Sequence, residues 1–268
     1  MSGLALGMFS PIIGSSDSIS ELCRVWLEDL YAQRSGPDGL SEDQQFDGFD
    51  VSSARFPKKG KCRYRVHDML RPFPAQYHGL YDLVHVRYLA QSLRNGQYTK
   101  AATNLMDLLS KPFNHYMSMS AKELPEPGGY IQWEEIDYAD ITVNPSAPIH
   151  EELMAIITGC FRACDISIRG SNDAQAALKA AGFECVSREE RNSYWENGLT
   201  HEVRKWAWSN INRCTARALI WSGLARDKDS AAIINRDMLS QLDREYSGGA
   251  VPNFAHRIVL GRKSVCDV

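Results

Sequence analysis

The sequence predicts an α/β protein built on a mainly parallel sheet with helices on both faces. In the stretch 81–89, the apolar residues Leu83, Val84 and Val86 are typical of a buried strand of a parallel sheet. Helices or loops separate this strand from the others, as βα units require. Three further strand-like segments occupy residues 46–51, 62–66 and 130–136.

The first half of the chain alternates between loops, strands and helices. Residues 1–18 are expected to be irregular, because Ile12-Ile13 is their one β-branched pair. Helical periodicity then predicts a helix over 18–34, with Ser18 and Glu21 spaced as a capping box. The same periodicity predicts a helix over 97–109, after the central strand.

The second half is predicted to be mainly helical. Strands are expected over 183–190 and 253–261. We predict one domain over 1–268, with a helical cap built largely from 148–182 and 194–225. The expected helices cover residues 149–163, 171–181, 198–224 and 230–246.

Composition excludes several classes of partner. The chain of 268 residues has a net charge of −3, so it lacks the basic footprint of nucleic-acid binding. There is no basic amphipathic run for a membrane surface and no apolar run of the roughly 18 residues that a membrane helix needs. The first residues lack a basic region, so we expect them to be neither a signal nor a transit peptide. The seven scattered cysteines favour a reducing, cytoplasmic setting. Cys160 and Cys164 lie one turn apart and are interpreted as buried thiols, so no metal is expected.

Four blocks of the sequence carry a specific resemblance. They are GFDVSSARFP at 48–57, RVHDMLRPFP at 65–74, YDLVHVRYL at 81–89 and PGGYIQWEEID at 127–137. In order and spacing, they resemble a class I S-adenosylmethionine-dependent methyltransferase. The greatest similarity is to the fungal group of secondary metabolism around the velvet-complex methyltransferase. The resemblance implies a Rossmann-like sheet with S-adenosylmethionine as its cofactor.

The nucleoside half of that cofactor has candidate ligands. An acidic residue at the end of a second strand can accept hydrogen bonds from ribose hydroxyls, and Asp50 holds such a position. The resemblance implies that Asp68 accepts from the adenine amino group, and that Met69 and Leu70 line the ring. The alternatives are that Asp50 starts a turn and that Asp68 caps one.

The resemblance fails at the cofactor loop. The group carries a glycine-rich loop before an apolar-Trp-Leu sequence, which lets backbone N–H groups approach the cofactor carboxylate. Here 25–27 (Val-Trp-Leu) aligns with that end, and the five residues 20–24 contain no glycine. With no first strand predicted either, the N-terminal cofactor region is expected to be degraded and S-adenosylmethionine binding to be weak or absent. Residues 110–126 are a second departure, inserted before the Pro-Gly-Gly turn.

Candidate substrate residues follow the central strands. His85 and Arg87 are the proposed catalytic residues, with His150 as another possible base and Glu134 and Glu135 nearby. The alternative for His85 is a satisfied polar side chain at a strand end. Aromatic side chains that would form a wall for a planar substrate are Trp133, Trp206 and Trp208, and the alternative for each is packing in the core.

Three functions remain open from the sequence. The first is a methyltransferase-like protein of fungal secondary-metabolite biosynthesis that is impaired in cofactor binding and binds or acts on an aromatic pathway intermediate. The second is an active methyltransferase on a small aromatic metabolite. The third is a non-catalytic partner subunit of another pathway enzyme.

Overall fold

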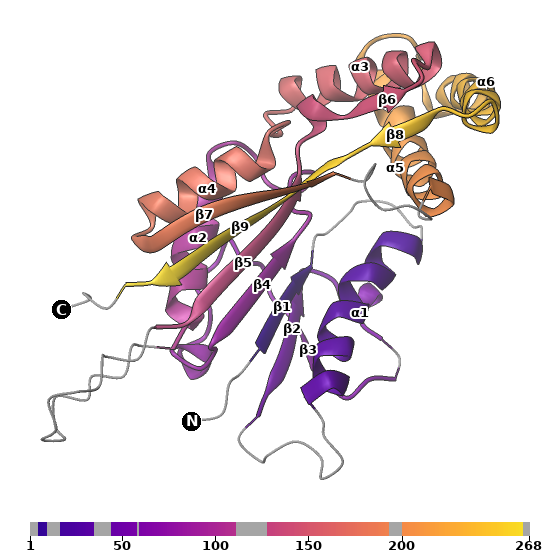
Figure 1. Cartoon of the computed structure of the whole chain (residues 1–268). Helices are drawn as coiled ribbons and strands as arrows, with labels where there is room; N and C mark the ends of the chain where they lie inside the picture. Colours follow the sequence, from indigo (N-terminus) through magenta and orange to yellow (C-terminus); the bar gives the residue numbers. More distant parts are fainter. Residues whose placement is uncertain are drawn as a thin grey trace, which may run out of the picture.

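A sheet of seven strands in the order β3-β2-β1-β4-β5-β9-β7 forms the centre of the described structure (Figure 1). The computed structural model describes residues 5–9, 17–34, 44–57, 59–110, 128–192 and 200–264. β1 to β5 run parallel, whereas β9 is antiparallel to both β5 and β7. The strands are β1 (Ala5–Phe9), β2 (Phe46–Asp50), β3 (Arg63–Val66), β4 (Leu83–Arg87), β5 (Tyr130–Ile136), β7 (Phe183–Asn192) and β9 (Ala255–Lys263).

The prediction of an α/β fold with a mainly parallel sheet is confirmed. β4, the strand expected from residues 81–89, is the middle strand of the seven. Its neighbours β1 and β5 pair with it in register over all five of its residues. β4 is buried on both faces, since Val84 and Val86 on one face and His85 on the other are each at most 1% exposed.

The prediction that residues 1–18 are irregular is wrong. β1 lies between β2 and β4 and pairs with both in parallel. Its sequence, ALGMF, has no β-branched residue, so local propensity gave no signal for it. The strand forms because two neighbours supply partners for its backbone groups, which is a tertiary effect.

The expected position of the cofactor loop is also wrong. Residues 20–24 lie within the helix α1 (Asp17–Arg34), not in the turn that precedes it. The connection between β1 and α1 is residues 10–16, which lie outside the described residues. The absence of glycine from 20–24 therefore says nothing about that connection.

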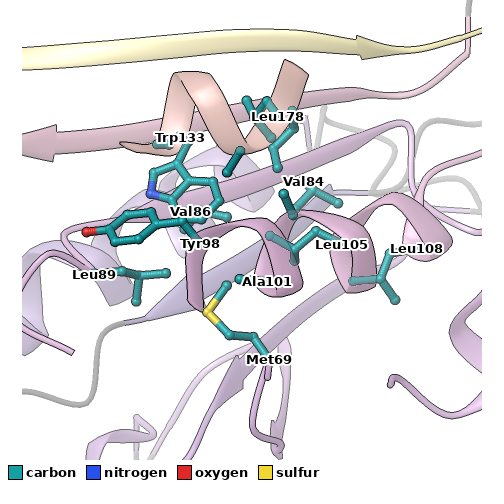
Figure 2. Packing of buried hydrophobic residues seen from close by; sticks show 14 of the residues in the cluster. Met69, Val84, Val86, Leu89, Tyr98, Ala101, Leu105, Leu108, Trp133 and Leu178 are labelled. Atoms are coloured by element: carbon teal, nitrogen blue, oxygen red, sulfur yellow. The ribbon is translucent and has the colours of Figure 1, made fainter. Parts of the chain in front are cut away.

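Helices cover both faces of the sheet. α2 (Gln97–Leu108) and α4 (Gly170–Ala180) pack on one face, and α1 packs on the other (Figure 1). The face under α2 and α4 is the main apolar core, in which Val84 and Val86 meet Leu105 and Leu178 (Figure 2). A smaller cluster around Leu27 joins α1 to β2.

A second body of helices stands beyond the carboxyl ends of the parallel strands (Figure 1). α3 (Pro148–Ala163), α5 (Thr200–Trp221) and α6 (Lys228–Ser247) share one apolar cluster there. A two-stranded sheet of β6 (Thr142–Asn144) and β8 (Val251–Asn253), which the sequence did not predict, lies beside them. The expected cap is corrected in two respects: α4 packs on the sheet, and α6 joins the cap helices.

The remaining predicted elements lie close to their expected bounds, although the expected strand 253–261 divides between β8 and β9. Residues 111–127, which include nearly all of the expected insertion, lie outside the described residues. In the part of the chain that the structure describes, none of the helices combines the length and apolarity needed to cross a membrane.

Candidate functional site

Strand alternation divides the polar side chains of β4 and β5 between two faces. Val84 and Val86 enter the core beneath α2 and α4, so His85 and Arg87 project to the α1 face. Glu134 of β5 pairs in register with Arg87 and lies on the same face. The two predicted catalytic residues are thus brought together around one carboxylate.

Glu134 is the centre of a buried polar cluster. Its Oε1 lies 3.0 Å from His85 Nε2 and accepts a hydrogen bond of 2.6 Å from Gln132 Nε2. Its Oε2 lies 3.0 Å from Arg87 Nε and 3.3 Å from His256 Nε2. Burial alone would raise the pKa of Glu134, but the two imidazoles and the guanidinium outweigh it and hold that pKa far below its usual value. Glu134 is therefore an ionised anchor.

His85 is sealed beneath α1. Its exposed fraction is 1%, and the Trp26 ring stacks on it with centroids 3.9 Å apart. Burial lowers the pKa of His85, so the ring is a neutral donor to Glu134. Arg87 pairs with Glu134, donates to the hydroxyl of Tyr88 and lies over the Tyr88 ring at 4.7 Å. His85 is thus enclosed between the Trp26 ring and the Glu134 carboxylate.

An open recess lies at the carboxyl ends of β4 and β5, under α5. The segment after β4 contributes Tyr88, which has a φ of 54°, a conformation that L-residues rarely adopt outside functional or tightly constrained sites. α5 contributes Trp206 and Asn210, four residues apart and so on one helix face. The complete lining is Tyr88, Ala90, Gln91, Glu135, Ile136, Tyr138, Trp206 and Asn210.

The recess combines aromatic walls with a few polar groups, which is the usual character of a small-molecule site. Trp206 lies with its ring centroid 6.4 Å from that of Tyr88, and Phe254 supports it edge-on at 4.4 Å. Tyr138 accepts a hydrogen bond from Gln91 through its hydroxyl oxygen. A planar ligand could therefore find both stacking surfaces and hydrogen-bond partners here.

Glu135 forms the buried end of the recess, on the opposite face of β5 from Glu134. It accepts hydrogen bonds from the backbone N–H groups of Leu89 (2.9 Å) and Ala90 (3.1 Å) and from Trp133 Nε1 (2.9 Å). Burial raises the pKa of Glu135 to about 8, although these three donors favour the carboxylate. The segment after β4 is thereby fastened to β5.

This pKa predicts a pH dependence of stability. Unfolded Glu135 loses its proton near its ordinary pKa of 4.5, whereas the folded protein holds the proton to about 8. The contribution is fully present below the unfolded value and is lost as pH rises through the folded one. We expect the free energy of unfolding of wild type to fall relative to that of Glu135→Gln as pH rises through this range, measured by urea denaturation. A difference that stays constant with pH would contradict the assignment.

The three tryptophans predicted to form an aromatic wall occupy three different environments. Trp206 lines the recess. Trp208 packs among the apolar residues of the cap. Trp133 is completely buried beneath α2 and α4, stacked on Tyr98 at 5.8 Å (Figure 2), so it is corrected to a core residue.

The predicted cofactor residues lie along the carboxyl ends of β2 and β3. Asp50 ends β2, is 2% exposed, and accepts a hydrogen bond of 2.9 Å from the Ser52 N–H through Oδ1. Asp68 is partly exposed and accepts from the Leu70 N–H at 2.9 Å. Met69 is corrected: its side chain packs in the main core near Ala101, and its carbonyl accepts from Asn104 (Figure 2).

Two other expectations concern His150 and metals. His150 is buried between α3 and α6, with Nδ1 2.9 Å from the Tyr246 hydroxyl, so it lies in the cap and not in the recess. Within the described ranges there is no group of three or more His, Cys, Asp or Glu side chains suited to a metal ion.

Sequence reasoning missed several residues of the site. Tyr88, Gln91 and Tyr138 follow the ends of β4 and β5, so their position just after a strand was the available signal. Asn210 was detectable only as the helix neighbour of Trp206. His256 had no local signal, because β9 enters the sheet beside β5 from the far end of the chain.

Among known proteins, fungal methyltransferases are similar to this chain in sequence. The chain is 36% identical over 116 residues to methyltransferase grgD of Penicillium sp., covering 42% of this chain and 35% of that protein. It is 26% identical over 167 residues to methyltransferase psoC of Aspergillus fumigatus, covering 62% of this chain and 52% of that protein. The chain thus spans between about a third and about half of the length of these relatives. No protein-family model matches.

Among solved structures, the CMeT domain of the citrinin polyketide synthase covers 98% of this chain and 47% of its own, with a TM-score of 0.47 and 10% identity. The fold class is defined by the strand order of the sheet, in which β9 lies antiparallel between β5 and β7. It is class I methyltransferase-like. In sequence, the chain is similar to fungal methyltransferases over part of its length.

Proposed function

We propose that this protein binds a small aromatic metabolite in the recess under α5 and S-adenosylmethionine along the neighbouring strand ends, and transfers a methyl group between them. The observation that carries the proposal is the place of the recess. Its lining follows the carboxyl ends of β4 and β5, and β1 and β2 end at the same edge of the sheet. In open α/β sheets, ligands bind at this edge.

The described residues fit part of the cofactor. Asp50 offers a carboxylate at the end of β2, where it could accept from ribose hydroxyls, and Asp68 offers one after β3. Met69 does not fit, since its side chain is in the core. When bound, the cofactor supplies an activated methyl group, and the protein's task is then mainly alignment and exclusion of water.

A second candidate function is ligand binding without methyl transfer. One observation favours it: the connection between β1 and α1, residues 10–16, contains a single glycine, Gly14, where the resembling group has several. Fewer positions then allow close backbone approach to the cofactor carboxylate. Impaired cofactor binding is therefore still supported, but by residues 10–16 and not by residues 20–24.

Calorimetric titration with S-adenosylmethionine and S-adenosylhomocysteine separates these candidates. Under the first, we expect micromolar binding, and Asp50→Ala should weaken it by about tenfold or more, because hydrogen bonds to a charged group contribute about 1.5–3 kcal/mol. The control is Asp82→Ala, an exposed carboxylate at the opposite end of β4. If wild type shows no binding, methyl transfer is excluded and the second candidate stands.

The substrate class follows from the recess and from a resemblance. The sequence also resembles the methyltransferase-like protein of the terrequinone (bis-indolylquinone) pathway, so indole-derived quinone precursors are the first compounds to test. We also propose that the protein is cytoplasmic and that it contacts other enzymes of the pathway. Methylation of none of these precursors, despite cofactor binding, would reject this substrate class.

A further inference from the structure

A polar contact between Gln91 and Tyr138 lies in the wall of the recess. Gln91 follows the end of β4, Tyr138 follows the end of β5, and both line the recess and are partly exposed. Gln91 Nε2 donates to the Tyr138 hydroxyl oxygen, and the hydroxyl proton has no acceptor among the described residues. If the amide is turned, the hydroxyl donates to Gln91 and both amide N–H groups are left. In either orientation the pair keeps a hydrogen-bond donor beyond its mutual bond.

The Tyr138 side chain is held in place before a ligand arrives. It begins a short 3₁₀ turn, and Arg257 pairs with the carboxylates of Asp137 and Asp140 on either side of it. Phe161 of α3 supports its ring edge-on, with the ring centroids 5.2 Å apart. Burial raises the pKa of Tyr138, so the hydroxyl keeps its proton at neutral pH. Because the wall is already ordered, a ligand that uses this contact has little ordering cost to overcome.

The charges around the recess favour a neutral oxygen acceptor as its ligand. Glu135 at the inner end already accepts three hydrogen bonds, and burial raises its pKa to about 8, so it offers little negative charge to an ammonium group at neutral pH. Arg213 is not a lining residue, but it donates to the amide oxygen of Asn210, which adds positive charge on that side. A carboxylate would lose its hydration in a mostly apolar recess without reaching a cation directly. A carbonyl oxygen needs only the donor that Gln91 and Tyr138 keep.

The size of the recess limits the size of the ligand. Its empty volume is about 280 Å³, just below the range of roughly 300–1,000 Å³ that is usual for small-molecule sites. Tyr88 and Trp206 supply aromatic walls against which a flat ring can pack. These features together favour a ligand of one or two rings that carries a single polar group.

We propose that the Gln91–Tyr138 pair determines ligand specificity by donating a hydrogen bond to the carbonyl oxygen of a neutral aromatic ligand of one or two rings. Tyr88 and Trp206 pack against the rings of that ligand. This inference rests on the ligand site of the proposed function and names its substrate class. The carbonyl group anchors the ligand, and the atom that accepts a methyl group lies elsewhere on it.

Three compounds with one two-ring skeleton test the proposal: indane, 1-indanone and 1-aminoindane. The second adds a carbonyl group to indane, and the third adds an amine that is protonated at neutral pH. Wild type should bind 1-indanone about 2–10-fold more tightly than indane, the effect of one hydrogen bond between neutral groups. It should bind 1-aminoindane more weakly than indane, because no free carboxylate meets the ammonium charge. Ligand-observed NMR titration of the full chain, without cofactor, measures the three affinities.

The double variant Gln91→Leu/Tyr138→Phe removes the polar groups and keeps most of the wall. It should abolish the preference for 1-indanone but change the affinity for indane by no more than about twofold, whereas a contact with only a structural role would affect both compounds alike. The control is Tyr130→Phe, at an exposed tyrosine at the start of β5, which should keep the preference.

Three results would each overturn the inference. They are no preference for 1-indanone over indane in wild type, tightest binding by 1-aminoindane, and a preference of wild-type size in the double variant. The cofactor titration is read separately. Cofactor binding without a preference for 1-indanone would reject this inference and keep methyl transfer open, whereas the preference without cofactor binding would support it together with the second candidate function.

Discussion

Replacing Arg257 with methionine is expected to destabilise the protein by about 3–5 kcal/mol, because it leaves a buried charge without its partner. The Arg257 guanidinium pairs with Asp137, with Asp140 at 2.8 Å and with Glu190 at 2.9 Å. Asp137 is completely buried, and its other partners are the N–H and hydroxyl of Ser171. Those neutral donors cannot compensate a buried carboxylate alone, so urea denaturation should show the loss.

The matched control lies on the same strand. Arg262→Met removes a single ion pair of 3.3 Å to Glu184, with both side chains partly exposed. Solvent screens a pair of this kind, so Arg262→Met should lose much less stability than Arg257→Met. The double variant Arg257→Met/Asp137→Asn should recover part of the stability, because the unpaired charge is gone. Equal effects of Arg257→Met and Arg262→Met would show that the buried network is not a determinant of stability.

Replacing Trp133 with alanine is expected to cost about 3–5 kcal/mol of stability, the range for deleting a buried aromatic side chain. The indole is completely buried and stacks on Tyr98 (Figure 2). Its Nε1 donates to Glu135. Its removal leaves a cavity beneath α2 and α4 and takes one donor from Glu135. Thermal or urea unfolding measures the loss directly.

This prediction distinguishes a core role from a substrate contact. Trp133→Phe should keep most of the packing and cost less than Trp133→Ala. Trp221→Ala, at a side chain 48% exposed near the end of α5, should change stability by no more than about 0.5 kcal/mol. A Trp133→Ala protein as stable as wild type, but unable to bind ligand, would restore the earlier expectation of an aromatic wall.

Local sequence patterns were sufficient for elements with a strong period. The apolar run of β4 specified a central strand, since only a strand buried on both faces tolerates it. The periodicity of α2 and α3 likewise gave their positions to within a residue or two. Polar residues just past strand ends correctly pointed to the edge at which the recess lies.

Local sequence patterns failed to predict features that depend on strand pairing or on tertiary packing. β1 has a sequence with weak strand propensity, and it forms because β2 and β4 supply hydrogen-bond partners on both sides. Because this strand was not predicted, the cofactor loop was predicted at the wrong residues. Trp133 and Trp206 look alike in sequence, but alternation along β5 buries one, and the position of α5 places the other in the recess.

The sequence by itself therefore determined the α/β class, the order of its main elements and the edge of the sheet at which the recess lies. These follow from hydrophobic period and from the geometry of parallel strands. Only the tertiary structure decided which side chains meet there. His85 and His256 are 171 positions apart, and they share Glu134 because β9 inserts antiparallel beside β5. That insertion is a long-range pairing with no local signature.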